Sequence, residues 1–547
     1  MILPSGINTS RYLISFTEKM GNLKRLSLFV RIFFAAVVIH VFTSAKNIGC
    51  RKPIEPGPRA YYLSDTGNDD HIGSIQNPWQ TIEKINSIHL EPGDSVFFEG
   101  GKIFSGKLLI DSNSRGTEAH PILISSYGNG HAKINGGNTA AVTLYLTNHV
   151  FLKNLDLAGY GRKKGNGKDG LSLINCHHIT ADSLDISGFQ KSGLLIFSST
   201  DILISNIKAH DNGAAGIAIE GSHGKKESRN IQIRECRAEN NPGDPTNLNN
   251  HSGNGIVAGH CTNLLIDHCT ATNNGWDMPR IGNGPVGIWC YESDSVTIQH
   301  CLSYRNKTSV GGADGGGFDF DGGITNSIIQ YCLSYENQGS GYCIFQYRGA
   351  SPWYNNVIRY NISENDGTVS DSKAGINIWN SSGDARQFHD CLVYNNTIYN
   401  TMEAAINFSE TSERKQFGFY NNIFIGKDNL IKGDKGMDIF HGNDWWGMTK
   451  KFNADGMLDF SAWAKKYQKE MISGKIVGFN IDPHFKAPGK TAINSFPQKE
   501  SFNKYKIPVN SLLRNRGLDL LHALNINTGH LDFNQKPAPA KAVGASF

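Results

Sequence analysis

The sequence predicts an all-β solenoid in which short parallel strands stack coil upon coil, and three observations carry this prediction. The 547 residues include 60 Gly and only 19% charged residues, a composition typical of many short strands joined by turns. Each repeat contains two apolar alternations, and the second of them is seen in residues 230–236 and 296–301. Glycines that open a strand recur every 23 to 39 residues, at Gly170, Gly193, Gly216, Gly255, Gly287, Gly317, Gly341 and Gly375. Because one such strand cannot bury its own face, we expect nine to twelve stacked coils around a continuous core.

Residues 1–50 are predicted to be a signal or targeting segment. Leu26–Ala45 is apolar and follows two basic residues, but its longest charge-free core, Ile32–Ile39, is too short to span a bilayer and fits a secretory signal. Small residues precede Lys46 and suit cleavage there, whereas a lipid on Cys50 is the alternative. We therefore expect an exported bacterial protein in the periplasm, at the cell surface or outside the cell, with a membrane contact only through lipidated Cys50.

The rest of the chain divides into four predicted parts. Residues 51–60, with three prolines, are expected to form a linker, and residues 61–143 an N-terminal cap and the first strands. Residues 144–429 carry the repeats, and residues 430–547 are expected to form a C-terminal cap. Caps are needed because the end coils of a solenoid would otherwise expose an apolar core and an unpaired strand edge.

Within the caps, two short helices are expected. Residues 82–89 and 457–470 can each form one, the second with Trp463 and Tyr467 on one face. The first strand of the solenoid is expected to begin at Ser95, after a Pro-Gly turn.

Two residue types recur once per coil in the second alternation. Cysteines stand at Cys236, Cys269, Cys301 and Cys332, and asparagines five residues later at Asn241, Asn274, Asn306 and Asn337. We predict that the cysteines form an internal ladder of free, buried thiols, although neighbouring coils are close enough for a disulfide. The asparagines are expected to stack in a turn, where their amides bond turn backbone groups and one another.

From about residue 60 to residue 547, the chain resembles secreted bacterial proteins of the pectin-lyase-like superfamily. The resemblance is carried by the N-terminal segment with its Pro-Gly turn, the repeated coils and the closing segment. It implies a single-stranded right-handed parallel β-helix with N- and C-terminal caps. It does not fix the reaction, because the superfamily includes lyases, glycosidases and binding proteins. The polygalacturonase motifs are absent, and so is a clear cluster of calcium-binding aspartates beside a lysine base, so no catalytic residue is transferred from a family.

The candidate catalytic residues lie in a glycine-rich stretch. Strict alternation from Gly317 to Gly322 places Asp319 and Asp321 on one face of a strand, roughly 6.5 to 7 Å apart. Unpaired carboxylates at this separation raise each other's pKa, which is costly without a use. Asp314, three residues before the strand, is a third candidate, and a solvated edge or a calcium site is the alternative interpretation.

The strand register predicts which side chains surround the aspartates. The outward positions of neighbouring coils hold Trp289, Tyr291, Asn377 and Trp379 within about 15 Å on one sheet face. Exposed aromatic rings can stack on sugar rings while Asp and Asn bond the hydroxyl groups. We therefore expect a carbohydrate-binding site, in which these four residues, Tyr347 and Arg348 contact the substrate. Surface aromatics covered by an inserted loop are the alternative.

These residues predict an enzyme that cleaves glycosidic bonds of a poly- or oligosaccharide, by hydrolysis with paired aspartates and no cofactor. The first alternative is β-elimination on a uronic-acid polymer, with calcium as a cofactor and Tyr347, Arg348 or Lys307 as the base. The second is a carbohydrate-binding surface protein without catalysis. A net charge of +4 without a basic block excludes a typical nucleic-acid footprint, and we expect a monomer. Substrate choice is expected to depend on inserted loops at residues 239–254, 275–285 and 365–373.

Overall fold

The computed structural model describes residues 59–163, 167–369, 373–409, 413–434, 438–496 and 502–547. The predicted signal segment, Cys50 and nearly all of the predicted linker lie outside these residues. The chain separates into two units, and the second, Pro58–Phe547, is described here. None of its described helices has the length and apolar character needed to cross a membrane.

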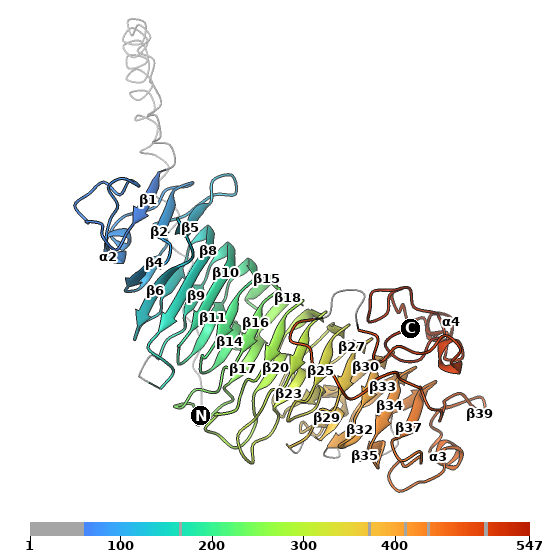
Figure 1. Cartoon of the computed structure of the whole chain (residues 1–547). Coiled ribbons are helices and arrows are strands. Elements are labelled where there is room, and N and C mark those ends of the chain that lie inside the picture. Colours follow the sequence, from blue (N-terminus) through green and yellow to red (C-terminus); the bar gives the residue numbers. More distant parts are fainter. Residues whose placement is uncertain (1–58, 164–166, 370–372, 410–412, 435–437, 497–501) are drawn as a thin grey trace, which may run out of the picture. The chain divides into compact units, whose positions relative to one another are not determined.

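The second unit is a right-handed parallel β-helix, which confirms the predicted fold class (Figure 1). Within the described residues, one sheet has twelve parallel strands, in agreement with nine to twelve coils. Its strands are β4 (Leu108–Ile110), β7 (Val142–Tyr145), β9 (Leu171–Ile174), β11 (Ser192–Phe197), β14 (Ala215–Glu220), β17 (Asn254–Gly259), β20 (Val286–Tyr291), β23 (Gly316–Phe320), β26 (Tyr342–Gln346), β29 (Ala374–Asn380), β32 (Ala404–Ser409) and β35 (Ile431–Lys432).

The other faces of the coils form a second sheet of 25 described strands. These are β1 (Ala60–Leu63), β2 (Ser95–Glu99), β3 (Ile103–Ser105), β5 (Ile122–Tyr127), β6 (Ala132–Gly137), β8 (Asn148–Gly159), β10 (His177–Ser187), β12 (Thr200–Ser205), β13 (Lys208–His210), β15 (Ser228–Arg234), β16 (Arg237–Glu239), β18 (Cys261–Asp267), β19 (Thr270–Thr272), β21 (Asp294–Gln299), β22 (Leu302–Tyr304), β24 (Ile328–Gln330), β25 (Leu333–Tyr335), β27 (Asn356–Arg359), β28 (Ile362–Glu364), β30 (His389–Tyr394), β31 (Thr397–Tyr399), β33 (Lys415–Tyr420), β34 (Ile423–Gly426), β36 (Ile439–His441) and β37 (Asp444–Gly447). Stacked strands therefore also occur before residue 144 and after residue 429 of the sequence.

The remaining elements are short. They are the helices α2 (Ile82–Asn86), α3 (Phe460–Tyr467) and α4 (Leu520–Leu524), the 3₁₀ turns η1 (Ala385–Gln387) and η2 (Leu512–Arg514), and the antiparallel pair β38 (Met471–Ile472) and β39 (Lys475–Ile476). Helices α2 and α3 lie within the two predicted helical segments but are shorter. Each begins where a side chain caps it, since Thr81 accepts from the Lys84 N–H and Asp459 from the Ala462 N–H.

The predicted asparagine ladder is present inside the coils. The Nδ2 of Asn241 donates to Asn274 Oδ1 at 2.9 Å, Asn274 to Asn306 at 2.9 Å, and Asn306 to Asn337 at 2.9 Å. Each amide also donates to a backbone carbonyl, as Asn306 does to Ala271 at 3.3 Å. All four side chains are buried, so the ladder satisfies polar groups that water cannot reach.

The same ladder explains why a glycine stands at the start of several of these strands. A Cβ atom built on Gly287 would lie 2.6 Å from Asn306 Nδ2 and 2.0 Å from Ser303 Oγ. On Gly317 it would lie 3.0 Å from Asn337 Nδ2 and 2.2 Å from Ser334 Oγ. Because no side chain fits beneath these amides, the periodic glycines of the sequence mark the positions that the ladder covers.

The four ladder cysteines are free and buried, as predicted, and so are the other described cysteines. We expect thiol titration of the denatured protein, without reductant, to find at least these four thiols reduced. The physical reason is that a thiol shielded by the coil core behaves as a small apolar side chain and does not meet an oxidant. Fewer than four free thiols would contradict this expectation.

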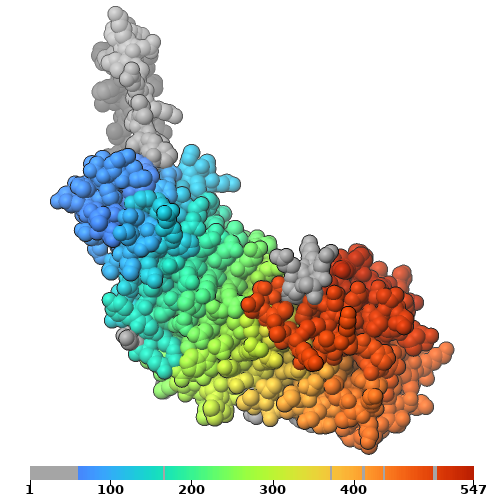
Figure 2. Space-filling view, viewed as in Figure 1, coloured from blue at the N-terminus to red at the C-terminus, as the bar shows by residue number. Residues whose placement is uncertain are grey.

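The C-terminal segment packs against the outer face of the larger sheet (Figure 2). Its main anchor is Glu364 in β28, a fully buried carboxylate that accepts hydrogen bonds from Tyr505 Oη, from the Thr491 N–H at 2.7 Å and from Thr491 Oγ1 at 2.7 Å. Asn395 Nδ2 adds a bond to the carbonyl of Ala542 at 2.8 Å. This segment therefore covers part of the second sheet.

Candidate active site

The predicted site residues lie on the outer face of the twelve-stranded sheet. In β20, β23, β26 and β29, the directly paired residues are Trp289, Asp319, Cys343 and Asn377, one in each successive coil. The next pair, Phe345 with Trp379, continues the same face. This is the register that the strand-opening glycines predict, so the aspartates and the aromatic residues share one face as expected.

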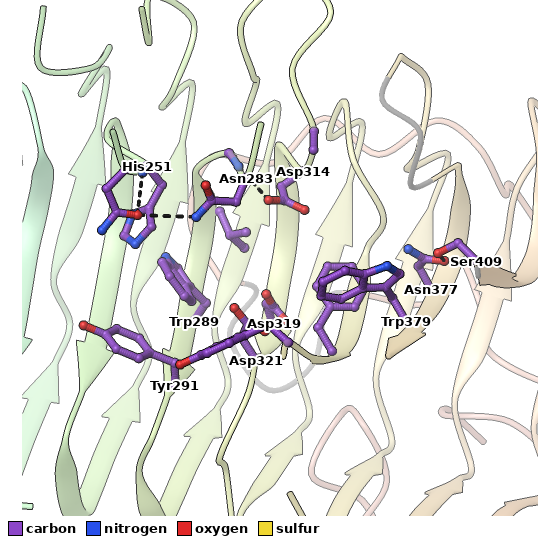
Figure 3. Close-up of a pocket in the computed structure, with 16 residues that line it drawn as sticks. His251, Asn283, Trp289, Tyr291, Asp314, Asp319, Asp321, Asn377, Trp379 and Ser409 are labelled. Carbon is purple, nitrogen blue, oxygen red and sulfur yellow. Dashed lines mark hydrogen bonds between the residues drawn. The ribbon is translucent and has the colours of Figure 1, made fainter. Parts of the chain in front are cut away.

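These side chains line a cavity of about 700 Å³, within the usual range for a small-molecule or oligosaccharide pocket (Figure 3). The lining residues are Asn250, His251, Asn283, Gly284, Val286, Trp289, Tyr291, Ala313, Asp314, Asp319, Asp321, Phe345, Tyr347, Asn377, Trp379 and Ser409. Among the described residues, the lining includes three aspartates and no lysine or arginine. The pocket is thus aromatic and acidic in character.

Asp319 is the most enclosed of the three aspartates. Its side chain is 3% exposed, and its Oδ1 is buried without any hydrogen-bond partner in the described residues. Burial, with the neighbouring Asp321 and Asp314, raises the pKa of Asp319 well above its usual range. An orphaned, buried carboxyl oxygen is costly, and it is the kind of group that a substrate can satisfy.

The other two aspartates have better partners. Asp321 accepts the Gly322 N–H at 2.7 Å, and burial, with the nearby Asp314 and Glu292, raises its pKa to about 7. Asp314 accepts the Gly284 N–H at 2.6 Å, and burial raises its pKa to about 6, with Arg280 opposing the shift. Burial therefore raises the pKa of all three carboxyl groups that line this pocket.

The raised pKa values predict a pH-dependent stability. An acid whose pKa is higher in the folded state binds protons that the unfolded chain releases, so the free energy of unfolding falls as pH rises from the ordinary carboxyl range to the raised value. We expect Asp319→Asn to remove part of this fall in the free energy of unfolding. Its melting temperature should exceed that of the wild type at pH 8, with a smaller difference at pH 5. An equal difference at both pH values would contradict the raised pKa of Asp319.

Aromatic side chains flank the acids on both sides (Figure 3). On one side Trp289 lies 5.5 Å from Tyr291 between ring centroids, and on the other Phe345 meets Trp379 edge to face at 5.8 Å. The expectation of exposed aromatics was wrong for Trp289, which is only 4% exposed because loop residues pack over it. Tyr291 is also held in place, since its hydroxyl donates to Glu220 at 2.8 Å. These aromatic side chains form walls of the pocket, and their contacts hold the rings in fixed orientations.

The structure brings most but not all of the predicted residues together. Asn377 lines the pocket, and its Oδ1 accepts from Ser409 Oγ at 2.9 Å. Tyr347 also lines it, with its hydroxyl 3.4 Å from Glu292 Oε1. Arg348, in contrast, is exposed and outside the lining, because the chain turns away after Tyr347. Lys307 likewise does not line the pocket, so neither predicted cation faces the aspartates.

Several lining residues were not identified from the sequence. Asn250 and His251 come from the segment between β16 and β17, and Asn283 and Gly284 from the segment between β19 and β20. Both segments lie in the predicted inserted loops. The long glycine steps therefore indicated where loops would be added, but strand register gives no conformation for them.

The candidate metal ligands lie elsewhere. Among the described acids, histidines and cysteines, only Asp267, His268 and His300 bring three ligand atoms within 4.8 Å of one another, and they lie at the second sheet, away from the pocket. Asp267 there already pairs with Arg234 at 3.0 Å. The three pocket aspartates do not form such a set.

Known proteins share the sequence pattern of this chain. Residues 61–372 match the family described as "Pel9A-like, right handed beta helix region". A lacto-N-biosidase of Bifidobacterium longum subsp. longum is 24% identical to this chain, and the match covers 68% of this chain and 29% of that protein. The chain thus spans less than a third of the length of this relative.

Solved structures with a similar fold include two carbohydrate-active enzymes. The GH136 lacto-N-biosidase from Eubacterium ramulus has 17% sequence identity and a TM-score of 0.48, covering 66% of this chain and 68% of that one. Pectate lyase Pel9A has 13% identity and a TM-score of 0.43, covering 89% and 96%. The family match extends over more than half of the sequence, and the chain therefore belongs to the Pel9A-like right-handed β-helix family.

Proposed function

We propose that the protein hydrolyses a glycosidic bond in a poly- or oligosaccharide, with its acid and base drawn from Asp319, Asp321 and Asp314. The observation that carries this proposal is the set of three carboxyl groups with raised pKa values in one pocket walled by aromatic rings. Glycoside hydrolysis needs one carboxyl group that keeps its proton and a second that is ionised. Aromatic walls supply the surface on which sugar rings stack.

The pKa order suggests how the roles divide. Asp314 has a backbone N–H donor and a pKa of about 6, so it is the aspartate most readily ionised near neutral pH. Asp319, buried without a partner, is the one that best retains a proton and can protonate the leaving oxygen. Asp321, with a pKa of about 7, can serve in either role.

Strand geometry supports Asp319 and Asp321 as the working pair of carboxyl groups. The Asp321 N–H donates to the Cys290 carbonyl at 2.9 Å, so the ladder continues past the end of β23. Same-face neighbours on a strand are then roughly 6.5 to 7 Å apart, close to the separation found in inverting glycosidases. This geometry favours inversion at the anomeric carbon if these two residues act together.

The lining also weighs against β-elimination on a uronic acid. That reaction needs a cation to neutralise the sugar carboxylate and a base to abstract a proton. No lysine or arginine is among the described lining residues, and the neighbouring aspartates would repel an anionic substrate. Tyr347 is a poor base, because burial and Glu292 raise the pKa of its hydroxyl. A preformed calcium site is not supported either, because the aspartates do not converge as calcium ligands do.

The relatives support a carbohydrate-active enzyme, since a lacto-N-biosidase shares sequence similarity with this chain. With this function we propose export, a monomeric state and hydrolysis without a cofactor. An uncharged oligosaccharide is the substrate class that fits a pocket of acids and aromatics best. A binding protein without catalysis would need the aromatic residues but not the three aspartates.

The test is a substrate panel assayed in two ways. It contains a chromogenic lacto-N-bioside, neutral oligosaccharides, and plant and algal polysaccharides with and without uronic acids. We expect new reducing ends without the ultraviolet absorbance of an unsaturated sugar. Appearance of that absorbance would identify a lyase, and binding without cleavage, lost in Trp289→Ala, would identify a binding protein.

A further inference from the structure

His251 lines the pocket from a loop whose position strand register could not predict. It lies in the loop before β17, lines the cavity and is half-buried. Its ring meets Trp289 edge to face, with 4.7 Å between ring centroids and 75° between the planes. His251 therefore stands beside Trp289, on one aromatic side of the pocket (Figure 3).

Asn254, at the start of β17, holds both of these rings. Its side chain is 2% exposed, and its Oδ1 accepts from Trp289 Nε1 at 3.0 Å and from the Val286 N–H at 3.3 Å. Its Nδ2 donates to the Ala214 carbonyl at 3.2 Å and lies 3.0 Å from His251 Nδ1. Asn254 thus makes four hydrogen bonds inside the wall of the pocket.

These partners fix the orientation of the Asn254 amide. An indole N–H and a backbone N–H can only donate, so they must face Oδ1, and a backbone carbonyl can only accept, so it must face Nδ2. The second Nδ2 proton then points at His251 Nδ1, which has to accept it. A neutral imidazole that accepts at Nδ1 carries its one proton at Nε2.

The imidazole ring is neutral near neutral pH, because burial and Arg280 lower the pKa of His251 to about 4. Its Nε2 has no hydrogen-bond partner in the described residues, and it is not among the polar atoms shut off from the surface. His251 is also one of the residues that line the cavity.

We propose that His251 donates its Nε2–H to an oxygen of the sugar that packs against Trp289, and that Asn254 is the positioning residue that sets this tautomer. Trp289 pairs directly with Asp319 in the next coil, about 4.8 Å away, so this sugar lies next to the bond that is cleaved. A neutral donor suits a hydroxyl or amide carbonyl oxygen. The inference rests on the proposed function, because it assigns a substrate contact in the same pocket.

The tautomer can be measured without a substrate. Nitrogen NMR of protein labelled on histidine distinguishes the two neutral tautomers, and the signals of His251 among the 19 histidines are those lost in His251→Phe. We expect the Nε2–H form in the wild type at neutral pH. In Asn254→Asp the carboxylate can only accept from the ring, so a proton should move to Nδ1. An Nδ1–H signal in the wild type would overturn the role of Asn254.

The substrate contact is tested by kinetics with the chromogenic lacto-N-bioside, or with the glycan of the panel that the wild type cleaves. His251→Phe keeps the ring against Trp289 but removes the donor, so we expect KM to rise about threefold to tenfold, with a smaller change in kcat. His389→Phe is the matched control, because His389 stacks on Tyr354 at 5.4 Å in the second sheet. Its KM should equal that of the wild type.

A double variant separates the two residues. If Asn254 acts through His251, Asn254→Asp should raise KM as a single substitution. In the His251→Phe background it should add little to the increase in KM. Full additivity would overturn the positioning role, and an unchanged KM in His251→Phe would overturn the substrate contact alone. If the wild type cleaves no glycan of the panel, the proposed function fails and the substrate contact fails with it.

Discussion

Asp321→Asn is expected to lower kcat by about 10²- to 10⁴-fold, the range that one acid or base group contributes to catalysis. Asparagine matches the shape of the side chain but cannot exchange the proton, so KM should change much less than kcat. The same substitution at Asp319 should have an effect of similar size. Melting temperatures should hold or rise, because each substitution relieves repulsion among the pocket carboxyl groups. The measurement is steady-state kinetics on the glycan that the panel identifies.

Leaving-group dependence then separates the acid from the base. A variant that lacks the general acid should keep most of its activity on a nitrophenyl glycoside, whose leaving group needs no proton, and lose it on a natural glycan. A variant that lacks the base or nucleophile should lose both activities. Asp390→Asn is the matched control, because Asp390 lies in β30 of the second sheet and outside the pocket lining. A folded Asp319→Asn, Asp321→Asn double variant with full activity would end the assignment of the pair.

Strand periodicity made the fold predictable from the sequence. A residue that recurs once per coil occupies the same place in every coil, so spacing alone was enough to assign the ladder cysteines and asparagines. The reason for an opening glycine is visible only in the structure, since a Cβ on Gly287 would collide with Ser303 in β22 and with Asn306 after it. Where coils become irregular, as around α3, the repeats no longer fix the boundaries, and the helix is shorter than predicted.

The site was predictable only in the part that strands build. Alternation and register placed Asp319, Trp289 and Asn377 on one face, and the paired residues are those expected. Arg348 does not line the pocket, because it follows a strand end where alternation stops. His251 was missed because a loop residue is placed by its own contacts, here to Asn254 and Trp289, and no periodic pattern encodes them.

Asn306→Leu is expected to lower the free energy of unfolding by about 2 to 4 kcal/mol, although leucine is apolar and similar in size. Asn306 is 1% exposed, and its Oδ1 accepts from the N–H and Nδ2 of Asn274 at 3.3 and 2.9 Å. Its Nδ2 donates to Ala271 O, Ser303 Oγ and Asn337 Oδ1. The substitution leaves several of these groups buried without a partner, and each costs about 1 to 3 kcal/mol. Urea unfolding followed by circular dichroism measures the loss.

The control for this prediction is an asparagine on the surface. Asn326 is exposed, bonds Asp294 at 2.7 Å and has a φ of 52°, which glycine adopts without strain. Asn326→Gly should cost less than about 1 kcal/mol, because water replaces the lost hydrogen bonds. Equal losses in the two variants would contradict a special role for the buried ladder.

Asn306 also lies in the coil that leads into β23, so the loss of its hydrogen bonds should loosen the position of Asp319. Asn306→Leu should therefore lose activity at temperatures below its unfolding transition.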